Sequence, residues 1–71
     1  MSKTVQLYAP DISCSHCAMT IQRALRPLDG IAQVEVDVPN KVITLTIKDD
    51  EALARAEAVL EEIGYSAQRV S

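Results

Sequence analysis

The hydrophobic pattern changes its period within residues 3–28, KTVQLYAPDISCSHCAMTIQRALRPL. Over residues 3–9 apolar side chains alternate with polar ones, which predicts a strand with one buried face. The proline that follows ends this strand, since proline has no backbone N–H to give to a sheet. Over residues 16–28 the apolar positions recur every three or four residues, which predicts a helix with one apolar stripe. Cys14 and Cys17 therefore lie where a loop leads into a helix.

The rest of the chain continues the same two periods. The predicted later elements are a strand at residues 34–38, a Pro39-Asn40 turn, a strand at residues 42–47, a helix with a buried stripe over residues 53–63 and a final strand at residues 65–70. Ser13 and Ser15 are candidate N-caps of the first helix. Three acidic residues complement the positive N-terminus of the second helix, namely Asp49, Asp50 and Glu51. We predict an α+β fold in which two helices cover one face of a four-stranded antiparallel sheet.

The composition excludes several classes of function. With 71 residues, 48% of them hydrophobic and no tryptophan or phenylalanine, a single domain over residues 1–71 has no room for a buried organic cofactor. The net charge of −3 and seven scattered basic residues disfavour nucleic acid as a partner. No run approaches the about 20 apolar residues of a membrane span, and the first residues lack a signal-peptide pattern. We therefore expect a soluble cytoplasmic protein without membrane insertion.

Both cysteines of the chain belong to one C-x-x-C motif. A disulfide between Cys14 and Cys17 would close a very short loop and constrain the unfolded chain little, so we expect the pair to serve chemistry. The N-terminus of a helix lowers the pKa of a nearby thiol, and thiolate is the form that binds metals. Soft thiolates favour Cu(I), with Zn(II) as a competitor, and two ligands are too few for the four-ligand cage of structural zinc.

At these residues the sequence resembles the heavy-metal-associated domain family, which includes bacterial copper chaperones and N-terminal domains of copper-transporting P-type ATPases. The motifs that carry the resemblance are DISCSHC at residues 11–17, ALRPLDGI at residues 24–31, the strand with Val34, Val36 and Val38, and IGY at residues 63–65. The resemblance covers nearly the whole chain. It implies a ferredoxin-like βαββαβ open-faced sandwich, metal binding by Cys14 and Cys17, and a place for Tyr65 beside the metal loop.

The motif departs from the usual Gly-Met-x-Cys-x-x-Cys of that family at its first two positions. Ile12 replaces a methionine that packs beneath the metal loop, and it can fill a similar volume. Asp11 brings a carboxylate near the thiolates, which would favour a harder ion such as Zn(II). Zinc-exporter domains of the family carry their aspartate at the position of Ser13 instead.

Three basic or imidazole side chains near the motif are further candidates. His16 lies between the cysteines, and we expect it to point away from the sulfurs, with direct ligation as the alternative. Arg23 and Arg26 share a face of the first helix. They are either merely solvated or part of a docking patch for an acidic partner.

The resemblance implies a metallochaperone, which is not an enzyme. We expect it to bind one Cu(I) and to pass it by thiolate exchange to the metal-binding domain of a copper-transporting P-type ATPase, with a copper-responsive regulator as a second partner. We expect a monomer without metal, and a copper-bridged dimer as an alternative when loaded. Two other functions stay open: a Zn(II)- or Hg(II)-handling domain of the same fold, and a small dithiol-disulfide oxidoreductase. The short chain and the absence of tryptophan before the motif disfavour the oxidoreductase.

Overall fold

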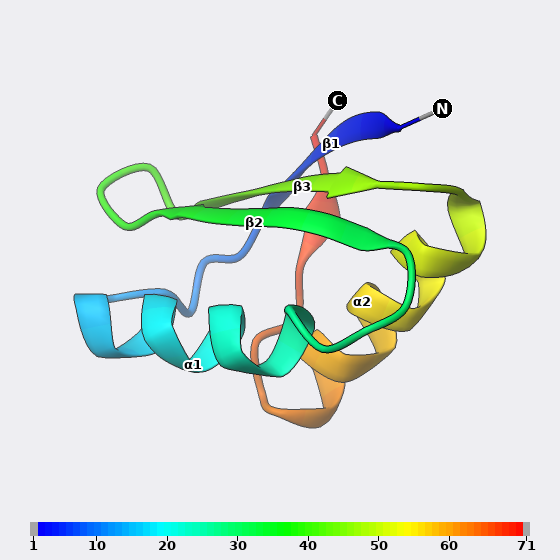
Figure 1. The fold of residues 1–71 in the computed structure, drawn as a ribbon. Coiled ribbons are helices and arrows are strands. Elements are labelled where there is room, and N and C mark those ends of the chain that lie inside the picture. Colours follow the sequence, from blue (N-terminus) through cyan, green and yellow to red (C-terminus); the bar gives the residue numbers. More distant parts are fainter. Residues whose placement is uncertain (1, 71) are drawn as a thin grey trace.

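Two helices lie against one face of a four-stranded antiparallel sheet in the computed structural model, which describes residues 2–70 (Figure 1). The elements are β1 (Lys3–Tyr8), α1 (Ser15–Leu25), β2 (Ile31–Asp37), β3 (Val42–Ile47), α2 (Asp50–Glu62) and β4 (Gln68–Arg69). Across the sheet the strands follow the order β2-β3-β1-β4, and each neighbouring pair is antiparallel. The predicted α+β, ferredoxin-like βαββαβ arrangement is confirmed.

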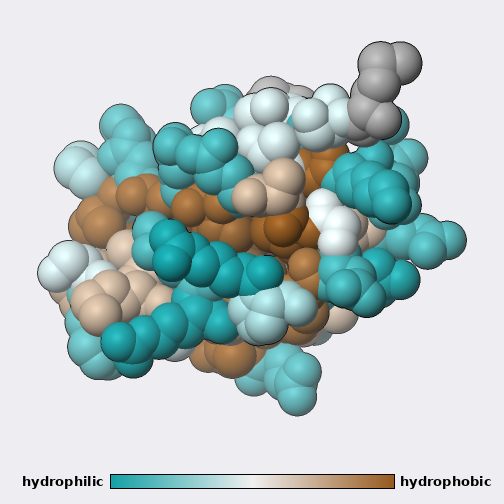
Figure 2. Space-filling model, viewed as in Figure 1, coloured by the Kyte–Doolittle hydropathy of each residue, from teal (hydrophilic) through white to brown (hydrophobic). Residues whose placement is uncertain are grey.

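The alternation along each strand places every second side chain against the helices. On β3, for example, Ile43, Leu45 and Ile47 are fully buried, because they face the apolar stripes of α1 and α2. The buried core consists of Leu7, Ala9, Ile12, Ile21, Leu25, Val34, Ile43, Leu45, Ile47, Ala52, Leu53, Ala56 and Leu60. Figure 2 shows the edge of this core as an apolar band between hydrophilic side chains of the sheet and helix layers.

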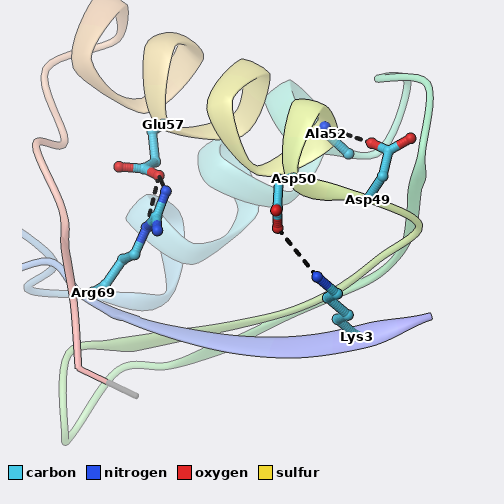
Figure 3. Close-up of polar contacts among 6 residues, drawn as sticks. All are labelled: Lys3, Asp49, Asp50, Ala52, Glu57 and Arg69. Atoms are coloured by element: carbon cyan, nitrogen blue, oxygen red, sulfur yellow. Dashed lines mark hydrogen bonds and ion pairs between the residues drawn. The ribbon is translucent and has the colours of Figure 1, made fainter. Parts of the chain in front are cut away.

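The two helices begin in different ways. Helix α2 has Asp49 as its N-cap, and the Asp49 carboxylate accepts the Ala52 N–H at 3.0 Å, as the acidic run predicted (Figure 3). Helix α1 has Cys14 as its N-cap, and no side chain caps it. The predicted capping by Ser13 or Ser15 is therefore wrong. An uncapped start leaves the first N–H groups of α1 without a side-chain acceptor from the N-cap residue.

Helix α1 also ends earlier than predicted. Its last residue is Leu25, whereas the apolar spacing predicted a helix as far as Leu28. The chain turns here because Pro27 has no N–H for a helical bond, and the Leu28 N–H donates instead to the Leu25 carbonyl at 3.1 Å. From this turn Leu28 still packs against the core, which explains why its spacing matched the helical stripe.

Two strands differ in length from their predictions. Strand β2 starts at Ile31, three residues before its predicted start, because a bulge near Gln33 breaks the alternation there. Strand β4 keeps only Gln68 and Arg69 of the predicted residues 65–70. The first residues after α2 complete the end of that helix and do not pair with β1.

Surface ion pairs join β1 and β4 to α2. The Lys3 ammonium lies 3.4 Å from the Asp50 carboxylate, and the Arg69 guanidinium lies 3.0 Å from the Glu57 carboxylate (Figure 3). Within residues 2–70, no helix is long and apolar enough to cross a membrane.

Three connections meet at one end of the sheet. Because β1 runs antiparallel to β3 and β4, the loop after β1 lies beside the β2–β3 hairpin and the α2–β4 connection. Both cysteines lie at this end, at the start of α1. The chain enters β1 from the opposite end, and β4 runs toward that opposite end (Figure 1).

Candidate metal-binding site

Two sulfur atoms form the centre of the site. Cys14 Sγ and Cys17 Sγ lie 3.5 Å apart, well beyond the about 2.05 Å of a disulfide bond, so both are free thiols. Cys14 is exposed and has extended backbone angles just before α1, whereas Cys17 is partly buried in the first turn. The Cys14 carbonyl accepts the Cys17 N–H at 3.1 Å, so the start of the helix fixes the spacing of the pair.

The loop before the cysteines is tied to the body of the domain at Ile12. The Ile12 side chain is fully buried, and its N–H donates to the Ala9 carbonyl at 3.1 Å. The Ile12 carbonyl accepts a hydrogen bond from the Lys41 ammonium on the β2–β3 hairpin. Nothing in the sequence singles out Lys41, because a lysine next to a turn is usually solvated.

Tyr65 reaches the site from the end of α2. The Gly64 N–H donates to the Glu61 carbonyl at 3.2 Å, and the Tyr65 N–H donates to the Leu60 carbonyl at 2.7 Å. This pair of bonds around Gly64, whose φ is +89°, is a Schellman motif. It turns the chain so that Tyr65 packs against the core, with its hydroxyl group close enough to the Cys17 sulfur to affect the pKa of that thiol.

The surroundings of Cys17 favour its thiolate. The Tyr65 hydroxyl group has the largest effect, and with the Ser13 backbone and the Cys14 thiol it lowers the pKa of Cys17 to about 6. The neighbouring Cys17 in turn raises the pKa of Tyr65. The Ser13 hydroxyl group also lies 3.9 Å from the Cys17 sulfur. Near neutral pH, Cys17 is therefore ready to bind a metal without first losing a proton.

Asp11 and His16 are both exposed. Asp11 lies close enough to contribute to the raised pKa of Tyr65. In the part of the chain that the structure describes, no group of three or more His, Cys, Asp or Glu side chains is arranged to hold a metal ion. The structure therefore does not bring Asp11 or His16 together with the two sulfurs as a ready ligand set.

Arg23 and Arg26 lie at the far end of α1 from the sulfurs. Arg23 is in the last turn, Arg26 is the C-cap, and both are exposed. At a rise of 1.5 Å per residue they follow Cys17 by about 9 Å and about 13 Å along the helix axis. They could contact a partner only if its interface extends along α1.

The family model described as "Heavy-metal-associated domain" matches residues 6–66. This match includes the loop, both cysteines and Tyr65. The chain belongs to the heavy-metal-associated domain family.

Relatives of this heavy-metal-associated domain are named for different metals. The mercuric transport protein periplasmic component of Shewanella putrefaciens is 33% identical over 54 residues, which cover 76% of this chain and only 59% of that relative. The copper chaperone CopZ of Staphylococcus aureus is 29% identical over 55 residues, which cover 76% of this chain and 81% of that relative. The solution structure of the N-terminal domain of ZntA in its Zn(II) form has a TM-score of 0.85 and 26% identity, over 93% of this chain and 89% of that one. Membership in the family thus establishes a metal-binding domain. It does not identify the metal, for which the geometry and chemistry of the site must be considered.

The geometry of the two sulfurs determines which coordination they offer. With a metal–sulfur bond of about 2.3 Å, as for zinc, sulfurs 3.5 Å apart enclose an angle of about 100° at the ion. A linear arrangement needs a separation of about 4.6 Å, so one sulfur must move outward by about 1 Å. Cys14 is the sulfur free to move, because it is exposed and precedes the helix. The open side of the pair is then accessible to an incoming ligand.

Proposed function

We propose that this chain is a soluble metallochaperone that carries one Cu(I) ion between the thiolates of Cys14 and Cys17. The observation that carries the proposal is a pair of free thiols, Cys14 exposed and Cys17 partly buried, with no third ligand arranged beside it within residues 2–70. Soft sulfur ligands select Cu(I), whereas structural zinc takes four ligands. The similarity to a protein named copper chaperone supports the same choice of metal.

The proposed activity is transfer of the ion by exchange of thiolates. An acceptor thiolate bonds to Cu(I) first, which gives a three-coordinate ion, and the bond from Cys14 to Cu(I) then breaks. Cys14 takes up a proton from solvent, and a second acceptor thiolate displaces Cys17 in the same way. No bond of an organic substrate forms or breaks, so the proposed activity is not enzymatic.

The acceptor we propose is the metal-binding domain of a copper-transporting P-type ATPase, with a copper-responsive regulator as a second acceptor. The cytoplasm is the proposed compartment, since its thiols are kept reduced. Two copies that share one Cu(I) through their exposed Cys14 thiols would form a copper-bridged dimer.

An anaerobic titration tests the metal. The reduced protein is titrated with Cu(I) against a chromophoric Cu(I) chelator, and in parallel with Zn(II). We expect one Cu(I) per chain, held much more tightly than Zn(II). The control is the double variant Cys14→Ser and Cys17→Ser, which should lose tight Cu(I) binding and keep the circular dichroism spectrum of the parent. Tight Cu(I) binding by the double variant would show that Cys14 and Cys17 are not the ligands and would contradict the proposal.

A Zn(II)- or Hg(II)-handling domain is the second candidate. The exposed Asp11 carboxylate favours Zn(II), and the similarity to the mercuric transport component favours Hg(II). Zn(II) that outcompetes Cu(I) in the titration, and loses this advantage in the Asp11→Asn variant, would move the assignment to divalent metals. Tight Hg(II) binding together with weak Cu(I) binding would favour mercury handling.

A dithiol-disulfide oxidoreductase would use the same two thiols. The lowered pKa of Cys17 is compatible with such chemistry, so it needs its own assay. We expect the reduced protein to reduce insulin far more slowly than a thioredoxin does. Reduction at a comparable rate would make the proposed carrier an enzyme instead.

A further inference from the structure

Lys41, in the turn between β2 and β3, hydrogen-bonds to the metal loop, residues 9–14 between β1 and α1. Lys41 is partly buried, and its ammonium group donates to the Ile12 carbonyl, 29 residues away in the sequence. Among the described residues, Lys41 forms no ion pair with a carboxylate. Its charge is therefore directed at the loop carbonyl and not at an acidic partner.

Hydrogen bonds also hold the backbone of Lys41 in place. Its φ is +59°, and its N–H donates to the Val38 carbonyl at 3.2 Å. Its carbonyl accepts the Ala9 N–H at 2.8 Å. A lysine rarely adopts a positive φ, so a turn held by bonds on both sides is needed to keep it there. The hairpin thus presents the ammonium group at a defined place.

Three separate contacts hold Ile12 as a result. Its side chain is buried in the core, its N–H bonds to Ala9, and its carbonyl bonds to Lys41. Only Ser13 separates this fixed residue from Cys14. Cys14 itself is exposed, and its sulfur must move if the pair opens for a linear ion. Movement of the metal loop is thereby confined to the short segment after Ile12.

We propose that Lys41 is a positioning residue that fixes the metal loop at Ile12 and so slows release of the bound ion by Cys14. This inference rests on the proposed carrier function. With the ammonium bond in place, Cys14 pivots about Ser13 only. Without it, Ile12 is held only by its buried side chain and its N–H bond to Ala9, so the segment that carries Cys14 moves more freely and the ion is released faster.

The test compares four variants of the full chain. Lys41→Met keeps the aliphatic length and removes the charge, and Lys41→Arg restores a cationic donor. Lys48→Met removes an equal charge from an exposed lysine whose side chain forms no hydrogen bond or ion pair in the described structure. Lys41→Asn is a further variant without the ammonium group, because asparagine tolerates a positive φ and keeps the turn. Folding of each variant is checked by circular dichroism.

Two measurements decide the outcome. In the reduced, metal-free protein, the backbone order parameters of Ser13 and Cys14 should fall in Lys41→Met to below about 0.6, the range of flexible segments. Release of Cu(I) to a competing chelator should become about tenfold faster, the size expected for loss of one hydrogen bond from a charged donor. Lys41→Arg and Lys48→Met should both behave like the parent.

Parent-like order parameters and release in both Lys41→Met and Lys41→Asn would overturn the inference. An equal effect of Lys48→Met would also overturn it, since net charge alone would then explain the change. If the parent chain fails to hold Cu(I), the carrier proposal fails by itself, and the order parameters of the metal-free protein still decide whether Lys41 positions the loop.

Discussion

The two cysteines have different surroundings, which give them different parts in the proposed metal handling. Cys17 is anchored in the first turn of α1, and the Tyr65 hydroxyl group stabilises its thiolate. Cys14 is exposed and belongs to the loop. A carrier needs one sulfur that retains the ion and one that yields its place to an acceptor. We expect Cys17 to retain the ion and Cys14 to exchange first.

The Tyr65→Phe variant tests the origin of the low pKa of Cys17. Loss of the hydroxyl group removes the largest cause of the shift, so the pKa of Cys17 should rise from about 6 toward its ordinary value of 9.0. A pH titration of the reduced, metal-free protein, followed by the ultraviolet absorbance of the thiolate, measures this pKa. An unchanged titration in Tyr65→Phe would assign the shift to the Ser13 backbone and the Cys14 thiol.

The same shift makes stability depend on pH. The pKa of Cys17 is lower in the folded protein than in the unfolded chain, so its thiolate stabilises the fold fully above pH 9.0, and this contribution is lost as the pH falls through about 6. The free energy of unfolding of the reduced protein should therefore rise between these values. The rise should be smaller in Tyr65→Phe.

Two glycines at the ends of the helices have nearly equal backbone angles and different surroundings. Gly30 follows the turn after α1 with φ +88°, and Gly64 follows α2 with φ +89°. A Cβ atom on Gly30 would lie 2.7 Å from the Cβ of the buried Ala52 on α2, whereas a Cβ on Gly64 would have no neighbour within 4 Å. Gly30 therefore allows α2 to approach the start of β2, in addition to closing a turn.

Alanine substitutions at these two glycines distinguish the cost of backbone strain from the cost of overpacking. Gly30→Ala and Gly64→Ala share the left-handed penalty of about 1–2 kcal/mol. Only Gly30→Ala adds the overpacking cost of about 1–3 kcal/mol, because α2 must shift to make room. Denaturant unfolding of both variants measures the two free energies. Equal losses of stability would show that α2 accommodates the added methyl group without cost.

The arrangement of the whole molecule was predictable wherever one face of an element is buried. Alternation identified β1 and β3, and the acidic run identified the cap at Asp49. The end of α1 was missed because Leu28 packs into the core from a turn as well as it would from a helix. The bond from Lys41 to Ile12 was beyond prediction, since it depends on tertiary approach of distant residues. At the site, the C-x-x-C motif indicated the sulfurs, but not their separation.

The metal-free protein should fold on its own. The core of buried aliphatic residues is formed between the sheet and both helices, and neither cysteine belongs to it. We therefore expect the reduced chain to give the same far-ultraviolet circular dichroism with and without Cu(I), and to unfold cooperatively in both states. Bound metal should raise the midpoint of thermal unfolding by an amount that grows with the logarithm of its affinity, as any ligand of the folded state does. A chain that unfolds when a chelator removes its metal would behave like a zinc finger instead.

The directions of β1 and β4 have a consequence for attachment. Any segment joined before Lys3 or after Val70 would leave the domain heading away from the two sulfurs. A flexible tether at either side would therefore leave the cysteines uncovered and let the domain rotate them toward a neighbour. Tethering raises the local concentration of a carrier at its acceptor without any new contact. The proposed carrier can thus work as a freely diffusing shuttle, as one unit of a tandem array, or immobilised on a surface through either end.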